Sequence, residues 1–265
     1  MQQYNVFHPL VLSFYSRSLY LDVGRNWSGS GFRYLLVLLT VAWLPAIVQM
    51  HQGLQQWIEN EGLEYTKQIP KITIQNGEVS TDVETPYIIR HPQTNQEVII
   101  IDLSGTYTSL EDTEAMVLLT NSKVWGRQEN RNEWRVYDLS GVELFTLDRD
   151  QAESWLRLFG NWFGLLAFPL MVAGSFAYRA VQALLYAAIG LGFAKRLKVK
   201  LSYQTLVRLS VIAITPAVVL STIVTLFRLE IPLVTLFYFV IAMWYLYWGV
   251  QANRENGPFA AVDIA

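Results

Sequence analysis

The chain has 265 residues, of which 52% are hydrophobic and only 16% are charged. Globular domains carry about 25% charged residues, so this composition indicates a chain with several membrane-spanning segments. The chain has no cysteine, which excludes disulfides, thiolate metal sites and a cysteine nucleophile. Its three histidines lie in separate segments without the spacing of metal ligands, so we predict no bound metal and no cofactor.

Residues 1–31 are predicted to form an amphipathic segment that does not cross the membrane. Apolar side chains recur there at helical spacing, with polar residues between them. A helix on the membrane surface and a helix packed under a bundle both fit this pattern. The side chains on the common face are Phe7, Leu10, Val11, Phe14, Ser18 and Leu21.

Long stretches without Asp, Glu, Lys or Arg mark the predicted membrane spans, because a crossing takes about 20 mostly apolar residues. Four such stretches are clear, at residues 32–50, 158–178, 204–227 and 231–250. Residues 180–194 are apolar but shorter. A single helix from Leu158 to Ala194 would be about 55 Å long, too long for one crossing. We therefore expect a helical hairpin near Arg179 and a bundle of five transmembrane helices, with four as the alternative.

Residues 51–157 are predicted to form an acidic, β-rich soluble domain inserted between the first two spans. Residues 59–157 carry 18 acidic and 9 basic residues, a net charge of −9. Lys71–Ile74 alternates polar and apolar residues and is followed by Asn76-Gly77, a strong hairpin signal.

Further strands are predicted in the same domain from their β-branched and aromatic residues. Tyr87–Arg90 and Glu97–Asp102 flank a polar turn, and Trp134–Tyr137 is expected to pair with Glu143–Leu147. A short helix is expected near Leu110–Leu119.

Basic residues in short segments next to spans stay in the cytoplasm. Arg17, Arg25 and Arg33 outnumber Asp22 before the first span, so we expect a cytoplasmic N-terminus and an extracytoplasmic soluble domain. The basic run Lys195–Lys200 conflicts with five spans, which would place it outside. Four spans would place it in the cytoplasm, and inverting the whole chain is a third solution. The side of the C-terminal tail, residues 251–265, stays open.

Two similar segments, IIIDLSGT and VYDLSGV, offer the only carboxylates with a repeated setting, Asp102 and Asp138. An Asp-x-Ser-Gly sequence after a strand could hold a ligand or a metal. It also suits a turn in which Asp and Ser cap backbone groups and Gly adopts a positive φ, and we favour this interpretation.

Polar and basic side chains near span ends are candidates for contacts with lipid head groups or a partner. Arg179 and Gln182 could share a recessed site with Tyr203, Gln204 and Arg208. No nucleic-acid patch is present. The full set of candidate contacts is Arg179, Gln182, Lys195, Arg196, Lys198, Lys200 and Arg208.

Several stretches resemble the bacterial family known as domain of unknown function 1189. They are Ser13–Leu39, the segments IPKITIQNGEVS, PYIIRHP and VIIIDLSGTYTSL, and Leu201–Val219. The resemblance implies a protein of the bacterial cytoplasmic (inner) membrane without an established activity. It also implies a membrane part similar to the five-span Yip-type bundle and, from some relatives, a role as a transport accessory. It supplies no catalytic residues.

The favoured function is a non-enzymatic scaffold or accessory factor that binds a partner through its soluble domain and bundle. Expected partners are membrane lipids, another membrane or extracytoplasmic protein, or a second copy of the chain. Lipid binding or lipid handling by the bundle is the first alternative, and a transport-accessory role the second. An enzyme acting at the interface through Asp102 and Asp138 is the least favoured.

Overall fold

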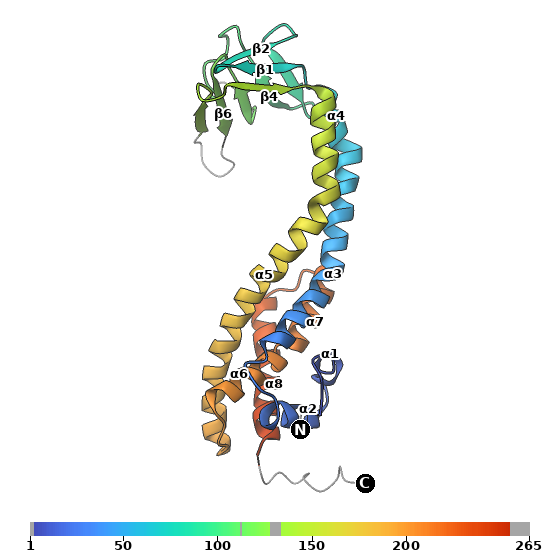
Figure 1. Cartoon of the computed structure of the whole chain (residues 1–265), viewed down its shortest axis with the longest axis vertical. Coiled ribbons are helices and arrows are strands. Elements are labelled where there is room, and N and C mark those ends of the chain that lie inside the picture. Colours follow the sequence, from blue (N-terminus) through green and yellow to red (C-terminus); the bar gives the residue numbers. More distant parts are fainter. Residues whose placement is uncertain (1–2, 112, 128–133, 255–265) are drawn as a thin grey trace. The chain divides into compact units, whose positions relative to one another are not determined.

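The structure is a computed structural model that describes residues 3–111, 113–127 and 134–254. The chain divides into two compact units, shown in Figure 1. Met1–Met50 and Gly164–Ala265 make up a helical unit, and His51–Phe163 make up a β-rich unit.

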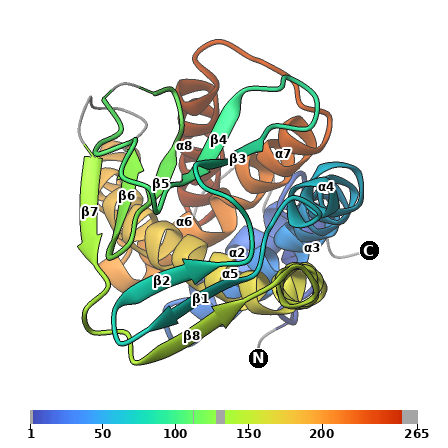
Figure 2. The ribbon, with the colours of Figure 1, turned by 90° about the horizontal axis from the view of Figure 1, so that it is seen from above.

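The β-rich unit contains two sheets. In Figure 2, β1 (Ile72–Gln75) lies between β2 (Glu78–Thr81) and β8 (Leu144–Leu147). The other sheet has five strands in the order β3-β4-β5-β6-β7, antiparallel except for the parallel pair β4 and β5. Its strands are β3 (Tyr87–Arg90), β4 (Glu97–Ile101), β5 (Val117–Leu119), β6 (Lys123–Arg127) and β7 (Trp134–Asp138).

The hairpin between β1 and β2 confirms the prediction from Asn76-Gly77. Asn76 has a φ of 50° and Gly77 a φ of 84°, as a two-residue turn with two left-handed positions requires. A Cβ atom on Gly77 would also lie 2.7 Å from the Cα of Ser140. The glycine therefore provides both the turn and the close approach of a neighbouring loop.

The predicted partners of the last two strands are wrong. β7 pairs with β6, and β8 pairs with β1, about 70 residues earlier in the chain. The helix predicted near Leu110–Leu119 is also wrong, because Val117–Leu119 form β5 between β4 and β6. β8 finds its partner far away in the sequence, whereas β5 and β7 pair with the neighbouring strand β6, and in both cases pairing within a sheet outweighs local preference.

Helical segments come before and after the strands in the chain. α3 (Phe32–Trp57) continues into a π-helical turn at Ile58–Gly62 and then α4 (Leu63–Thr66). On the other side, the Asp148 carboxylate accepts a hydrogen bond from the Gln151 N–H (2.8 Å) and caps the start of α5 (Arg149–Leu197).

The helical hairpin predicted near Arg179 is absent, because α5 is a continuous helix of 49 residues. Ala180–Ala194 contains no proline, and its many Ala and Leu residues favour a helix. The expected break rested on membrane thickness alone. α5 ends where Lys198, at a φ of 57°, allows the Val199 N–H to bond the Ala194 carbonyl at 2.9 Å.

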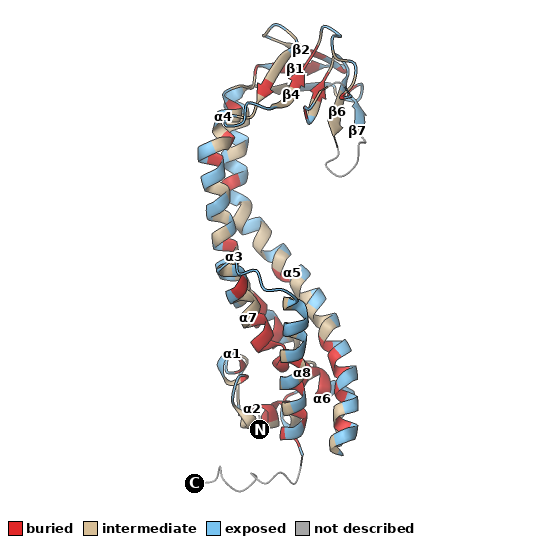
Figure 3. Ribbon diagram, turned by 180° about the vertical axis from the view of Figure 1, so that it is seen from behind, coloured by how far each residue is buried: buried red, intermediate tan, exposed pale blue. Residues whose placement is uncertain are grey.

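The span predicted at 204–227 consists of two helices, α6 (Tyr203–Ala213) and α7 (Thr215–Leu226). Pro216 lies at the start of α7, where its missing N–H and its ring interrupt the helix. Figure 3 shows that buried residues gather on α6 and the first half of α7. This pair is the centre of the helical unit, and α8 (Val234–Ala252) packs against both helices.

The N-terminal segment divides into two helices with different surroundings. α2 (Arg17–Arg25) packs against α6 and α8 and buries Leu19, Tyr20 and Val23. α1 (Pro9–Leu12) and its flanks leave Phe7, Val11 and Phe14 exposed. Packing against the bundle is therefore the arrangement of α2. Of the face predicted from helical spacing, Phe7, Val11 and Phe14 are exposed, whereas Leu10 and Leu21 are half-buried against the core.

Within the described residues, four helical segments are long and apolar enough to cross a membrane. These are Phe32–Thr66, Arg149–Leu197, Tyr203–Leu226 and Val234–Ala252. Large apolar side chains are exposed on the outer helices of the helical unit, including Leu170, Leu236 and Trp244. Water would oppose such exposure, and lipid would favour it, so the helices indicate a membrane-associated protein.

Candidate functional site

Three polar side chains form a hydrogen-bonded ladder on one face of α5. The Arg179 guanidinium donates from Nη1 to Oε1 of Gln182 at 2.7 Å, and Gln182 Nε2 donates to the Tyr186 hydroxyl at 2.8 Å. Residues three and four positions apart face the same way on a helix, so the ladder follows from sequence spacing. The guanidinium carbon also lies 5.5 Å from the ring centroid of Tyr178.

Arg179 lines two hollows of the helical unit. The smaller, about 120 Å³, lies between α3, α5 and α7 and is lined by Ser221, Thr222 and Thr225 among others. The larger, about 550 Å³, lies between α5, α7 and α8. Its walls are formed by Tyr178, Arg179, Gln182, Tyr186, Ile214, Ala217, Thr235, Leu236, Tyr238, Phe239 and Ala242. The Arg179 guanidinium thus borders both hollows, whose walls consist mainly of apolar and hydroxyl-bearing side chains.

The predicted shared site with Tyr203 and Arg208 is not formed. Arg208 donates to the Gly29 carbonyl at 3.2 Å and to the Thr205 hydroxyl at 2.9 Å. The Tyr203 hydroxyl donates to the Leu184 carbonyl at 2.9 Å. These contacts fix the start of α6 against α5 and the loop before α3, so Arg208 has a positioning role separate from the Arg179 ladder.

Basic residues gather at one end of the helical unit, where α2 packs against α8 and where α5 also ends (Figure 1). Lys195, Arg196, Lys198 and Lys200 are exposed at the end of α5 and in the linker that follows. Arg17 and Arg25 on α2 and Arg254 after α8 belong to the same end. In the described residues of this end, Asp22 is the only acid. We name these seven cations and their surroundings the basic end.

The basic end is held together by close packing between α2 and α8. Asn253 Nδ2 donates to the carbonyls of Tyr20 (3.1 Å) and Gly249 (2.9 Å). A Cβ atom on Gly249 would lie 2.6 Å from the Tyr20 ring, so the glycine permits the contact.

Asp22 is a structural centre that sequence reasoning missed. Its carboxylate accepts hydrogen bonds from the backbone N–H groups of Gln3 and Tyr4 (3.0–3.1 Å), from Asn26 Nδ2 (2.7 Å) and from Trp27 Nε1 (3.1 Å). Burial raises the pKa of Asp22, but these hydrogen bonds outweigh burial and hold the pKa below its ordinary value. The sequence offered one signal for this role, a lone acid among three arginines. Those four charges served only to predict the orientation in the membrane.

A family model described as "Protein of unknown function (DUF1189)" matches residues 7–250. The chain belongs to this family. The match includes all the helices and strands except for the last two residues of α8, and it confirms the resemblance seen in Ser13–Leu39 and the soluble segments. No curated protein and no solved structure matches the chain.

In this DUF1189 chain, the two Asp-x-Ser-Gly corners have the geometry of the turn interpretation. Asp102 is 1% exposed and accepts hydrogen bonds from the Ser104 N–H (2.9 Å), the Ser104 hydroxyl (2.6 Å) and the Tyr107 N–H (2.5 Å). Burial by itself would raise the pKa of Asp102. The hydrogen bonds lower the pKa by more, so it lies below its ordinary value. Asp138 is exposed and accepts from the Ser140 N–H at 2.8 Å. Each carboxylate therefore accepts hydrogen bonds from the turn that directly follows it in the chain.

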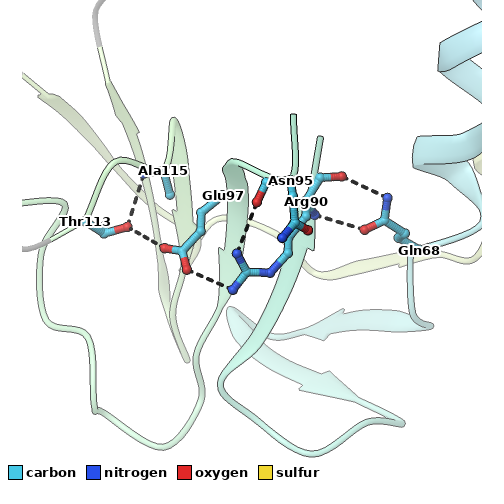
Figure 4. Close-up of polar contacts among 6 residues, drawn as sticks. All are labelled: Gln68, Arg90, Asn95, Glu97, Thr113 and Ala115. Atoms are coloured by element: carbon cyan, nitrogen blue, oxygen red, sulfur yellow. Dashed lines mark hydrogen bonds and ion pairs between the residues drawn. The ribbon is translucent and has the colours of Figure 1, made fainter. Parts of the chain in front are cut away.

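One outer edge of the five-stranded sheet is occupied by a side chain. Figure 4 shows that the Gln68 amide donates to the Arg90 carbonyl and accepts from the Arg90 N–H, both at 2.9 Å. The amide thus pairs with β3 as a neighbouring strand would. The Arg90 guanidinium in turn donates to Glu97 at 3.0 Å, and Glu97 accepts from the Thr113 hydroxyl at 3.2 Å. These bonds tie β3, β4 and the segment before β5 together.

The opposite edge, β7, has no partner beyond β6 in the described residues. Four of its five residues are exposed, including Val136 (43%) and Tyr137 (56%). The Leu139 N–H bonds the Ser122 carbonyl, and in antiparallel strands hydrogen-bonded pairs alternate. The backbone groups of Val136 therefore point away from β6. This edge combines free backbone groups with exposed apolar side chains.

Proposed function

We propose that the protein is a multi-pass protein of the bacterial cytoplasmic membrane that acts without catalysis, as a scaffold or accessory factor. In this proposal its β-rich unit lies outside the cytoplasm and binds an extended segment of a partner protein along β7. The observation that carries the proposal is the open β7 edge, in contrast to the occupied edge at β3. Open edges with exposed apolar residues are sites where another strand can add. A role beside a transporter would be one form of this function.

The continuous α5 supports the proposed orientation. With α5 as one crossing, the chain crosses through α3, α5, α6–α7 and α8, four times in all. The N-terminal segment, Lys195–Lys200 and Arg254 then fall on one side. A single side for all these cations agrees with the positive-inside rule, so the conflict found with five spans disappears.

Single cysteines test the orientation, because the natural chain has none. Ser80→Cys on β2 and Lys200→Cys after α5 both stand at exposed positions. We expect an impermeant thiol reagent added to intact cells to label the cysteine at position 80 and not the one at position 200. Labelling of both or of the second alone would contradict four crossings with an external β-rich unit.

A photo-crosslinking amino acid at position 137 tests the β7 edge in the full-length protein in cells. Val136→Pro removes an outward N–H, whereas the matched control Val136→Ala shortens the side chain and keeps that N–H. We expect a defined adduct that Val136→Ala retains and Val136→Pro loses about tenfold or more. Equal adduct yield in the two variants would contradict strand addition. Amide exchange of β6 checks that the proline variant stays folded.

A further inference from the structure

The Arg179 cation has no acidic partner among the residues that the structure describes. Among the described residues, no carboxylate forms an ion pair with it, and its bonded partner is the neutral amide of Gln182. Its side chain is only partly exposed and lies between apolar helices. Keeping a charge in such surroundings costs free energy unless an anion compensates it.

The direction of the hydrogen bonds shows which groups remain available. A guanidinium only donates, so the Gln182 oxygen must face Arg179 and the amide nitrogen must face Tyr186. The Tyr186 oxygen therefore accepts, and its own hydrogen is left to donate. No acceptor for that hydrogen, and none for the other Arg179 N–H groups, occurs among the hydrogen bonds of the described residues. The ladder thus leaves a charged donor at Arg179 and a neutral donor at Tyr186 that an anionic group could accept from.

The larger hollow provides space beside these donors. At about 550 Å³ it falls in the range of small-molecule sites. Ile214, Ala217 and Ala242 form buried apolar walls, while Leu236 (55% exposed) and Phe239 (37%) stand at its outer side. A ligand that fits would carry a negative group toward Arg179 and a hydrocarbon chain along these walls.

We propose that Arg179, Gln182 and Tyr186 bind the anionic head group of an acyl lipid, whose chain occupies the hollow between α5, α7 and α8. The observations that select this ligand are the unpaired cation, the outward donors and the apolar walls in one hollow. The site is independent of the β7 edge, since all its residues belong to the helical unit.

The full-length protein in mild detergent, mixed with phosphatidylglycerol and phosphatidylcholine, tests this site by native mass spectrometry. We expect wild type to retain phosphatidylglycerol selectively and Arg179→Gln to retain about tenfold less, because a charge-assisted contact is lost. Arg149→Gln is the matched control, since it removes an exposed arginine from the same helix, outside the basic end. Equal retention in Arg179→Gln, or an equal loss in Arg149→Gln, would overturn the proposal.

A second variant and a second probe sharpen the result. Tyr186→Phe removes one donor without removing charge, and it should weaken retention about threefold to tenfold. It also keeps the proposal testable if Arg179→Gln does not fold; unchanged retention in Tyr186→Phe would then count against it. Inorganic phosphate should not raise the melting temperature of wild type as phosphatidylglycerol does. An equal rise with phosphate alone would overturn the assignment of a lipid.

Discussion

The two units of the molecule differ in how their cationic side chains are paired with acids. In the β-rich unit, Arg90 pairs with Glu97 on the neighbouring strand, and Arg157 pairs with Glu59 on another helical segment and with Glu153 on its own helix. In the helical unit, seven cations stand at the basic end with a single acid, and Arg179 lacks an acidic partner among the described residues. Both units nevertheless contain one buried aspartate that accepts several hydrogen bonds, Asp22 and Asp102.

This contrast concerns the partners of individual cations and not the net charge. The β-rich unit keeps a net charge of −9 over residues 59–157, but Arg90 and Arg157 each have an acidic partner there, and Gln68 pairs with the β3 edge at Arg90. In the helical unit, by contrast, Arg179 and the exposed lysines at the end of α5 form no ion pair within the described residues. The two buried aspartates offer the sharpest test, because they have similar roles in the two settings.

The largest expected effect is at Asp22. In Asp22→Asn, one carboxylate oxygen becomes an amide nitrogen that cannot accept, so buried donors such as Trp27 Nε1 lose their partner. We expect the free energy of local opening around α2 to fall by about 3 kcal/mol, measured by amide hydrogen exchange in detergent. Arg25→Gln, exposed on the same helix, is the control and should change it by less than about 0.5 kcal/mol. Equal protection in both variants would show that Asp22 does not anchor the segment.

Asp102 should have a smaller effect, because its donors belong to one local turn. Asp102→Asn is expected to destabilise the β-rich unit by about 2 kcal/mol. Asp138→Asn is the matched control, and as an exposed residue in the same sequence setting it should cause a smaller change. Amide exchange of β4 and β5 measures both, and similar losses would contradict the distinction by burial.

Asp102 also gives the β-rich unit an acid dependence. Its pKa is lower in the folded state than in the unfolded chain, where it is about 3.9. The carboxylate therefore stabilises the fold fully at pH values well above 3.9, and this contribution is lost as pH falls through the folded pKa. Exchange protection of wild type should fall over that acid range more than that of Asp102→Asn. Parallel pH profiles would be inconsistent with the lowered pKa.

The smallest expected effect is at the ion pair of Arg90 and Glu97, whose side chains are 40% and 29% exposed. Glu97→Gln should destabilise the sheet by less than about 1 kcal/mol, and added salt should reduce the difference from wild type. Glu78→Gln on β2 is the control, since Glu78 forms no ion pair within the described residues. A loss well above 1 kcal/mol would mean that these cross-strand charges are central to the unit.

Local signals predicted much of this structure. Asn76-Gly77 determined the first hairpin, because the turn needs two residues that tolerate a positive φ. Arg179 and Gln182 were expected in one recessed site, and their place on one helical face became clear only from the unbroken α5. The five-span count is unconfirmed, and the expected hairpin near Arg179 failed because the sequence there favours an unbroken helix. The C-terminal residues 255–265 of the predicted tail lie outside the described residues.

Non-local contacts account for the rest. No residue near β8 identifies β1 as its partner. The donors to Asp22 include backbone N–H groups of Gln3 and Tyr4, and a backbone group gives no signal in the sequence. The sequence also did not show that Arg208 and Arg179 belong to separate sites, because this depends on the contact between the loop at Gly29 and α6. Spacing along one helix can be read from sequence, whereas contacts between segments need the fold.

The Gln68 amide on β3 has a consequence for self-association. A sheet with two free edges can add copies at both and grow without limit, as fibres do. Within the described residues, the five-stranded sheet has its Arg90 edge filled by Gln68 and its β7 edge free. Two copies that met through β7 would use the same strand on each side and so close into a symmetric pair. One glutamine side chain thus caps the backbone groups of Arg90, so that within the described residues β7 is the more open edge of this sheet for a further strand.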